Sequence, residues 1–112
     1  MIDGYVFGTI SVNGDTFNSD VEVHWNGDVL KWQRGEQGLI VPDDLASALK
    51  YEPSAIFIGT GFDGLVKVDE KTIETLKSKG IEPVINKTRI IIQEFNIATY
   101  SKKKVIGLFC VS

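Results

Sequence analysis

The amino-acid sequence predicts an α/β fold of the mixed α+β kind. We expect a three-layer domain in which an N-terminal antiparallel β meander and a β-α-β-α-β unit form one mixed central sheet. Two Asn-Gly dipeptides separate β-rich segments in the first third of the chain, and an apolar run at residues 55–59 is followed by alternating helical and strand patterns. The length of 112 residues fits a single globular domain, residues 1–112.

The first third of the chain has the pattern of paired antiparallel strands. Residues 5–12 and 16–25 are rich in β-branched and aromatic side chains and flank the Asn-Gly pair at residues 13–14, a strong hairpin signal. The second Asn-Gly pair, at residues 26–27, precedes a segment at residues 29–32 where apolar and polar side chains alternate. We therefore predict an antiparallel meander.

Two helices are predicted from their terminal residues. A short helix opens at Pro42 with two acidic residues in its first turn, which suits the positive helix end, and it ends before Pro53. A second helix has Asp69 as its N-cap and Gly80 as a left-handed C-cap, with Leu76 on its buried stripe. A short strand at residues 84–86 should follow.

The segment at residues 88–101 has two competing patterns. Three consecutive isoleucines at residues 90–92 favour a strand, whereas Ile91, Phe95 and Ala98 share one helical face. We predict a helix, because residues 55–59, the Asp69 helix, residues 84–86, this segment and residues 105–111 then alternate as β-α-β-α-β. Residues 55–58 should form a central strand buried on both faces, since they lack polar alternation.

Composition argues against nucleic-acid and membrane partners. With 12 basic and 15 acidic residues the net charge is -3, and the basic run at residues 102–104 is expected to be a solvated turn. The chain starts without a signal-peptide pattern, and no stretch approaches the roughly 18 apolar residues of a membrane span. The single cysteine, Cys110, lies in an apolar run and is expected to be a small buried hydrophobic residue. Because one cysteine cannot form an internal disulfide, we expect a reducing compartment and a cytoplasmic location.

Residues suited to catalysis are few. His24 is the only histidine, and a surface or cross-strand role is favoured over general-base chemistry. One His and one Cys cannot supply a usual zinc site, and no serine lies in a nucleophile-elbow pattern. We predict no catalytic residue, no metal and no cofactor.

Residues 54–64 form the best candidate for a site, because an apolar strand there runs into clustered glycines. Its three glycines, Gly59, Gly61 and Gly64, have the G-x-G-x-x-G spacing. A dinucleotide site is disfavoured, because residues 65–68 separate the loop from the Asp69 helix. Two interpretations stay open: a sharp turn, or a loop whose amides hold a small anionic or polar ligand with Arg34 or Lys67 nearby. The predicted ligand-binding residues are Gly59, Thr60, Gly61, Phe62, Asp63 and Arg34.

Several short motifs together carry a family resemblance. They are Gly4-Tyr5-x-Phe7-Gly8, Asn13-Gly14, Val29-x-x-Trp32, Ile58-Gly59-Thr60-Gly61, Gly80-Ile81, Phe95-Asn96 and Val105-Ile106-Gly107-Leu108-Phe109-Cys110. The chain resembles the archaeal and bacterial members of the small conserved proteins of unknown function related to mitochondrial complex I assembly factor 3 and to the adipogenesis-associated domain protein. The resemblance implies a compact three-layer domain with a mixed sheet. Gly59, Thr60 and Gly61 match the family's pattern directly. Many relatives have an arginine shortly before the Phe-Asn or Tyr-Asn pair, where this chain has Gln93, which weakens any anion-binding role there.

Two functions from different classes are therefore predicted. The favoured one is a non-enzymatic interaction or assembly module with a protein partner or a homo-oligomer, which the resemblance supports. The aromatic residues that could anchor a partner are Trp25, Trp32, Phe62 and Tyr100. The alternative for each of them is burial in the hydrophobic core. The alternative is an enzyme or sensor for a small anionic metabolite, centred on the glycine-rich loop at residues 59–64.

Overall fold

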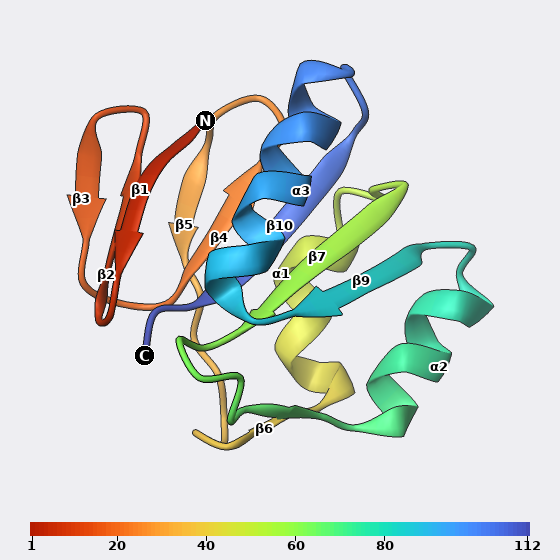
Figure 1. Cartoon of the computed structure of the whole chain (residues 1–112). Coiled ribbons are helices and arrows are strands. Elements are labelled where there is room, and N and C mark those ends of the chain that lie inside the picture. Colours follow the sequence, from red (N-terminus) through yellow and green to blue (C-terminus); the bar gives the residue numbers. More distant parts are fainter.

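The computed structural model describes residues 1–112 and has a mixed five-stranded sheet at its centre, with the strand order β5-β4-β10-β7-β9 (Figure 1). A three-stranded antiparallel sheet, β1-β2-β3, lies beside it, and β6 and β8 form a short parallel pair. The strands are β1 (Ile2–Val6), β2 (Thr9–Val12), β3 (Asp15–Phe17), β4 (Val21–His24), β5 (Val29–Lys31), β6 (Leu39–Ile40), β7 (Ala55–Thr60), β8 (Lys67–Val68), β9 (Glu82–Asn86) and β10 (Val105–Cys110). The helical segments are η1 (Pro42–Leu45), α1 (Ala46–Leu49), α2 (Glu70–Ser78) and α3 (Thr88–Tyr100).

Strand β7 is an interior strand of the sheet, as the sequence predicts for residues 55–58. It pairs in parallel with β10 on one side, where Ile56 lies opposite Ile106, and with β9 on the other, where Ile56 lies opposite Pro83. All six residues of β7 are buried, as expected for a strand without polar alternation. The parallel β-α-β-α-β unit is thereby confirmed.

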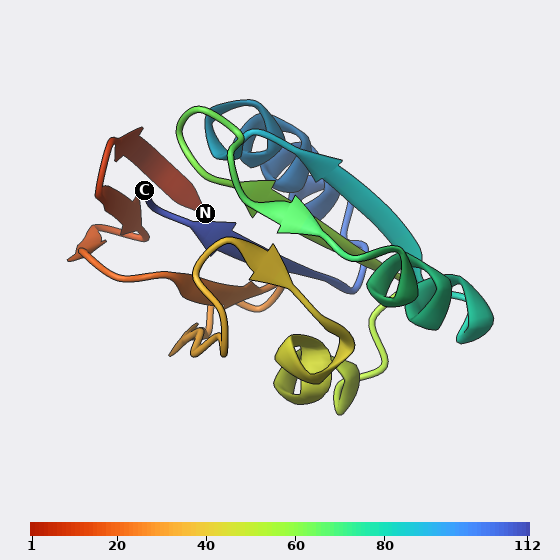
Figure 2. The ribbon, with the colours of Figure 1, turned by 90° about the horizontal axis from the view of Figure 1, so that it is seen from below.

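The helices cover both faces of this sheet, so that it separates two apolar cores (Figure 2). Phe57 of β7 packs toward α3 against Phe95, whereas its neighbours Ile56 and Ile58 face the core that contains Leu45 and Leu76. The three-stranded sheet joins the α3 side through residues such as Ile10. None of the helices combines the length and apolar character needed to cross a membrane.

The predicted helix ends are confirmed. The Asp69 carboxylate accepts a hydrogen bond from the N–H of Lys71 at the start of α2. Gly80 has a φ of +72°, and the N–H of Ile81 then donates to the carbonyl of Leu76 at 2.9 Å, which closes the C-terminal end. The isoleucine-rich segment is helical, and the face predicted from its spacing is buried as α3 packs on β7 and β10.

The N-terminal strands differ from their predicted extents. Residues 5–12 break into β1 and β2 at Gly8, whose φ of +85° permits a tight reversal. Residues 16–25 divide into β3 and β4, which belong to different sheets, because β4 pairs with β10 in the central sheet and places His24 opposite Ile106. The two Asn-Gly pairs do join paired strands, β2 with β3 and β4 with β5.

Candidate functional site

Gly59 and Thr60 end strand β7, and the glycine-rich loop continues from Gly61. A Cβ atom added to Gly59 would lie 2.6 Å from Oγ1 and 3.0 Å from Cα of Thr88, the first residue of α3. Glycine at this position therefore lets the helix approach the strand closely. The Thr60 hydroxyl donates a hydrogen bond to the carbonyl of Asn86 at 3.2 Å, which ties β7 to the end of β9.

Gly61 is bonded to the same helix terminus. Its N–H donates to Thr88 Oγ1 at 2.9 Å, and its carbonyl accepts from the N–H of Thr88 at 3.1 Å. Its φ of +100° is a conformation that glycine adopts without strain. By contrast, the N–H groups of Phe62, Asp63 and Leu65 have no hydrogen-bond partner within the chain. The unbonded amides of the loop therefore come after Gly61.

Arg34 lies among the residues that close the central sheet. Its guanidinium bonds to the Asp20 carboxylate at 2.9 and 3.1 Å and to the carbonyls of Glu36 and Gln37, and its side chain is largely buried. The other Asp20 oxygen accepts from the N–H of Val111. Arg34 thus joins the segment after β5 to the ends of β4 and β10.

A small cavity of about 130 Å³ lies beside this ion pair. It is lined by Asp20, Arg34, Gln37, Val66, Cys110 and Ser112. Ser112 and Val66 also border Gly61, so the cavity adjoins the inner side of the loop. Burial, and secondly the nearby Asp20 carboxylate, raise the pKa of the Cys110 thiol to about 12. The thiol is therefore protonated at neutral pH and is a poor nucleophile.

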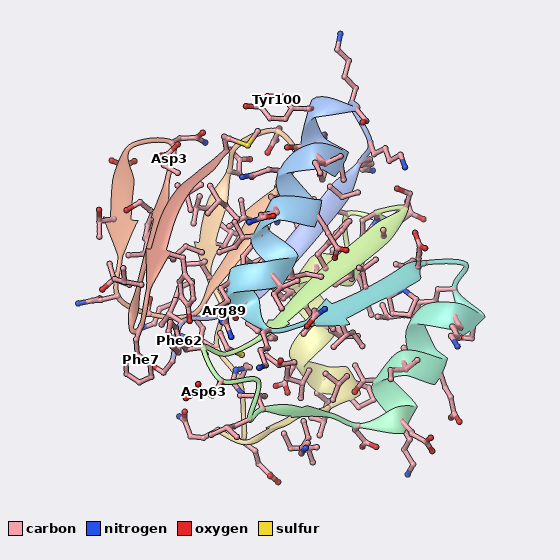
Figure 3. All side chains as sticks on the ribbon, viewed as in Figure 1. Asp3, Phe7, Phe62, Asp63, Arg89 and Tyr100 are labelled. Atoms are coloured by element: carbon pink, nitrogen blue, oxygen red, sulfur yellow. The ribbon has the colours of Figure 1, made fainter.

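The loop and the β1–β2 turn together form an aromatic cluster on the surface (Figure 3). The ring of Phe62 lies 6.1 Å from that of Tyr5 and 5.9 Å from that of Phe7, which meets it edge-on. The guanidinium carbon of Arg89, in the first turn of α3, lies 5.7 Å from the centre of the Phe62 ring. Three distant segments of the chain therefore meet at Phe62.

Much of this cluster is open to solvent. Phe7 is 63% exposed and the Arg89 side chain is also exposed, whereas Phe62 is half-buried. We call Phe7, Phe62 and Arg89 the Phe7 patch. An exposed aromatic ring beside a second ring and an arginine is typical of protein interaction surfaces.

The Phe7 patch is held firmly on the central sheet. The Tyr5 hydroxyl donates to the carbonyl of Val111 at 2.9 Å, and the N–H of Gly8 donates to the same carbonyl at 2.7 Å. Burial is the largest cause of the raised pKa of Tyr5, so its hydroxyl keeps this donor proton at neutral pH. The turn that carries Phe7 is thereby fixed between these two anchors.

The structure separates the aromatic residues singled out in the sequence. Trp32 is a core residue whose indole N–H donates to the carbonyl of Asp44, and Trp25 is half-buried under the Lys104 ammonium. Tyr100 is exposed at the far end of α3 from Arg89 (Figure 3). Phe62 alone of the four lies in the Phe7 patch. The sequence did not lead us to predict Phe7 or Arg89 as site residues. For Phe7, the usable signal was Gly8, the glycine that follows it.

Comparisons with known proteins find one matching family and the same fold in several solved structures. The family described as "Protein of unknown function (DUF498/DUF598)" matches residues 2–110. The conserved hypothetical protein PH1505 from Pyrococcus horikoshii OT3 is 17% identical, with a TM-score of 0.90 over 100% of this chain and 98% of that one. A protein called MT938 is 20% identical, with a TM-score of 0.85 over 100% and 97% of the two chains. A Bordetella pertussis protein described as an Mth938-like domain is 18% identical, with a TM-score of 0.70 over 98% and 84%.

Proposed function

Because the chain belongs to the DUF498/DUF598 family, which is described as being of unknown function, we propose from its own surface that it is a non-enzymatic interaction module. Its docking surface is the Phe7 patch, and its partner is another protein. The resemblance to proteins related to complex I assembly factor 3 supports an assembly role of this kind. The observation that carries the proposal is the exposure of Phe7 beside Phe62 and Arg89, on a turn that two hydrogen bonds hold in place.

The Phe7 patch has the composition of an interface centre. Aromatic side chains and arginine contribute most of the binding energy in protein interfaces, and here an arginine lies over the Phe62 ring beside the exposed ring of Phe7. The hydrogen bonds of Tyr5 and Gly8 hold the backbone on both sides of Phe7, so little backbone conformational entropy is lost when it binds.

The charge of the patch defines the partner's chemistry. Arg89 has no ion pair in the chain, and neither has Lys87, the residue that precedes α3. A free guanidinium beside an apolar anchor is complementary to a carboxylate next to an apolar side chain. The partner is therefore a protein surface or segment that carries an acidic residue adjacent to a large apolar one.

A photo-crosslinking experiment tests the proposal. A benzoyl-bearing crosslinker is placed at position 7, and in a parallel protein at position 100, and each is activated in a cell lysate. The protein captured from position 7 alone is purified, and its affinity for the parent chain is measured directly. We expect Phe7→Ser and Arg89→Glu each to weaken binding by about tenfold or more.

Tyr100→Ser is the matched control, because it also removes an exposed aromatic ring on the α3 side of the molecule. It should leave the affinity unchanged, and reversing the charge of the partner's acidic residue should restore binding to Arg89→Glu. Equal affinity of the parent chain and Phe7→Ser would overturn the proposal. So would the absence of any protein that crosslinks from position 7 in preference to position 100.

The second candidate function is binding of a small anion at the glycine-rich loop. The specific observation in its favour is that the N–H groups of Phe62, Asp63 and Leu65 have no partner within the chain. Unpaired loop amides are the groups that bind phosphates and carboxylates in other proteins. In this version the ligand lies beyond Gly61, while Gly59, Thr60 and Gly61 support the loop.

A further inference from the structure

The Asn96 side chain of α3 bonds to the backbone of β1 and belongs to neither the Phe7 patch nor the glycine-rich loop. The N–H of Ile2 donates to Asn96 Oδ1 at 3.1 Å, and Asn96 Nδ2 donates to the carbonyl of Ile2 at 3.0 Å. Both hydrogen bonds are partly buried. The carboxamide therefore exchanges two hydrogen bonds with Ile2, as a residue of a neighbouring antiparallel strand does.

Asparagine is suited to this position by its chemistry. A carboxamide has both a donor and an acceptor, whereas an aspartate of the same shape lacks the donor and a leucine lacks both. The preceding residue, Phe95, lies in the core, where its ring meets those of Phe57 and Phe109 edge-on. The Phe95-Asn96 motif thus joins a core anchor of α3 to a contact with β1.

The three-stranded sheet β1-β2-β3, which we call the N-terminal sheet, has no strand pairing with the five-stranded sheet. Two hydrogen bonds join it to α3, and both are made by Asn96. Two others come from the Tyr5 hydroxyl and the N–H of Gly8, and both converge on one atom, the carbonyl oxygen of Val111. The N-terminal sheet is therefore hydrogen-bonded to the rest of the chain at two places.

A single atom defines a pivot, so a fixed orientation needs a second point of attachment. The apolar side chains of Ile10 and Val12 pack into the core on the α3 side, but the hydrophobic effect has no preferred direction. Ile2 begins β1, whereas Phe7 follows its last residue, so the contact with Asn96 lies at the opposite end of the strand from Phe7. Asn96 therefore supplies the directional contact that the Val111 pivot lacks.

The Phe7 patch is assembled across the same boundary. Phe7 lies on the turn between β1 and β2, whereas Phe62 lies on the glycine-rich loop and Arg89 on α3 (Figure 3). The helix that carries Arg89 also carries Asn96, about two turns further along. The distance between Phe7 and Phe62 thus depends on how the N-terminal sheet is oriented on α3.

We propose that Asn96 is a positioning residue for the Phe7 patch. Its carboxamide holds the N-terminal sheet in one orientation on α3 and thereby places the Phe7 ring against that of Phe62. The consequence for partner binding rests on the proposed function, whereas the placement of Phe7 can be measured without a partner.

Hydrogen exchange in the parent chain tests the contact itself. The side-chain NH₂ protons of Asn96 should exchange about tenfold or more slowly than those of Gln93. Gln93 is the matched control, because it lies on the exposed side of the same helix. Equal exchange of the two side chains would overturn the proposal.

An NMR comparison of variants tests the placement of Phe7. In the parent, the rings of Phe7 and Phe62 lie 5.9 Å apart and should give a nuclear Overhauser effect. Asn96→Leu removes the donor and the acceptor, so this ring signal should be lost while the Phe57 to Phe95 signal of the core persists. Ile81→Val is the stability control, because it removes a methyl group from the opposite core, and it should keep both signals.

An unchanged ring signal between Phe7 and Phe62 in folded Asn96→Leu overturns the proposal. An equal loss in Ile81→Val also overturns it, because the loss would then be a general effect of lower stability. If Asn96→Leu does not fold, Asn96→Asp keeps the shape and the acceptor alone, and an unchanged ring signal in that variant overturns the proposal.

Partner binding is measured separately. A protein captured from position 7 should bind folded Asn96→Leu about tenfold more weakly than the parent chain. Parent-like affinity together with a lost ring signal would overturn the role of Asn96 in binding. If position 7 captures no protein, the proposed function fails, and the exchange and ring signals still decide whether Asn96 places Phe7.

Discussion

The buried hydroxyl of Thr88 accepts a hydrogen bond from the backbone N–H of Gly61 at 2.9 Å. The same hydroxyl donates to the carbonyl of Cys110 at 2.7 Å. One side chain at the start of α3 therefore bonds both to the end of β10 and to Gly61 of the glycine-rich loop. This arrangement ties the loop that carries Phe62 to the first turn of α3, where Arg89 lies.

Thr88→Val should lower the free energy of unfolding by about 2 to 4 kcal/mol, because it leaves a buried N–H and a buried carbonyl without a partner. Urea denaturation measures the change. Thr88→Ser retains the hydroxyl and should cost clearly less than Thr88→Val. The control is Thr75→Val on α2, whose hydroxyl bonds to the Lys71 carbonyl near the surface, and which should change stability by less than about 0.5 kcal/mol. Equal effects at positions 88 and 75 would contradict the role assigned to Thr88.

Gly59→Ala should destabilise the fold by about 1 to 3 kcal/mol, because the added methyl group would lie within 3.0 Å of both the backbone and the side chain of Thr88. Gly4→Ala is the matched control, since Gly4 also lies in a strand and a Cβ there meets nothing within 4 Å. Thermal unfolding followed by circular dichroism measures both. A neutral Gly59→Ala variant would show that α3 can move away from β7 without cost.

Trp32→Ala should lower the free energy of unfolding by about 3 to 5 kcal/mol, since the ring is buried and its N–H is bonded to the carbonyl of Asp44. Trp25→Ala should cost clearly less, because Trp25 is only half-buried. Chemical denaturation of the two variants beside the parent tests this order. The reverse order would place Trp25 in the core.

Cys110 should make stability fall at alkaline pH. Its pKa is raised from an ordinary value near 9 to about 12 in the folded protein, so the unfolded chain loses this proton first as the pH rises. The stabilisation is complete below about pH 9 and is lost progressively as the pH rises toward 12. Cys110→Val has no thiol and should lose less stability than the parent over this window.

The same burial makes a reactivity test possible. Ellman's reagent should not modify native Cys110 at about pH 8, and it should modify the thiol at once in denaturant. Rapid modification of the native protein, or identical pH profiles for the parent and Cys110→Val, would contradict the buried, protonated thiol.

Phosphate, sulfate or a small carboxylate should raise the melting temperature if the loop amides bind an anion. The shift should grow with anion concentration, and the N–H signals of Phe62 and Asp63 should move in a ¹⁵N spectrum. Asp63→Asn should strengthen binding, because it removes a like charge from the loop. The exposed Glu82→Gln, on β9, is the charge-matched control. If none of these anions raises the melting temperature, the glycines have a structural role only.

The sequence by itself determined the elements whose signals are local. The apolar run of β7, the caps at Asp69 and Gly80, the helical spacing of Ile91, Phe95 and Ala98, and both Asn-Gly turns each depend on neighbours a few residues away. Such signals are set by backbone conformation and by the periods of helices and strands. They were sufficient to predict the parallel β-α-β-α-β unit.

Only the tertiary structure decided which surfaces are covered and which residues meet. The alternation in β4 predicts an outward polar face, yet Glu22 and His24 are buried because η1 and α1 cover that face. Phe7, Phe62 and Arg89 come from three separate segments, and nothing in their local sequence relates them. Strand alternation specifies two faces but not the layer that packs on each, because burial depends on contacts between residues far apart in the chain.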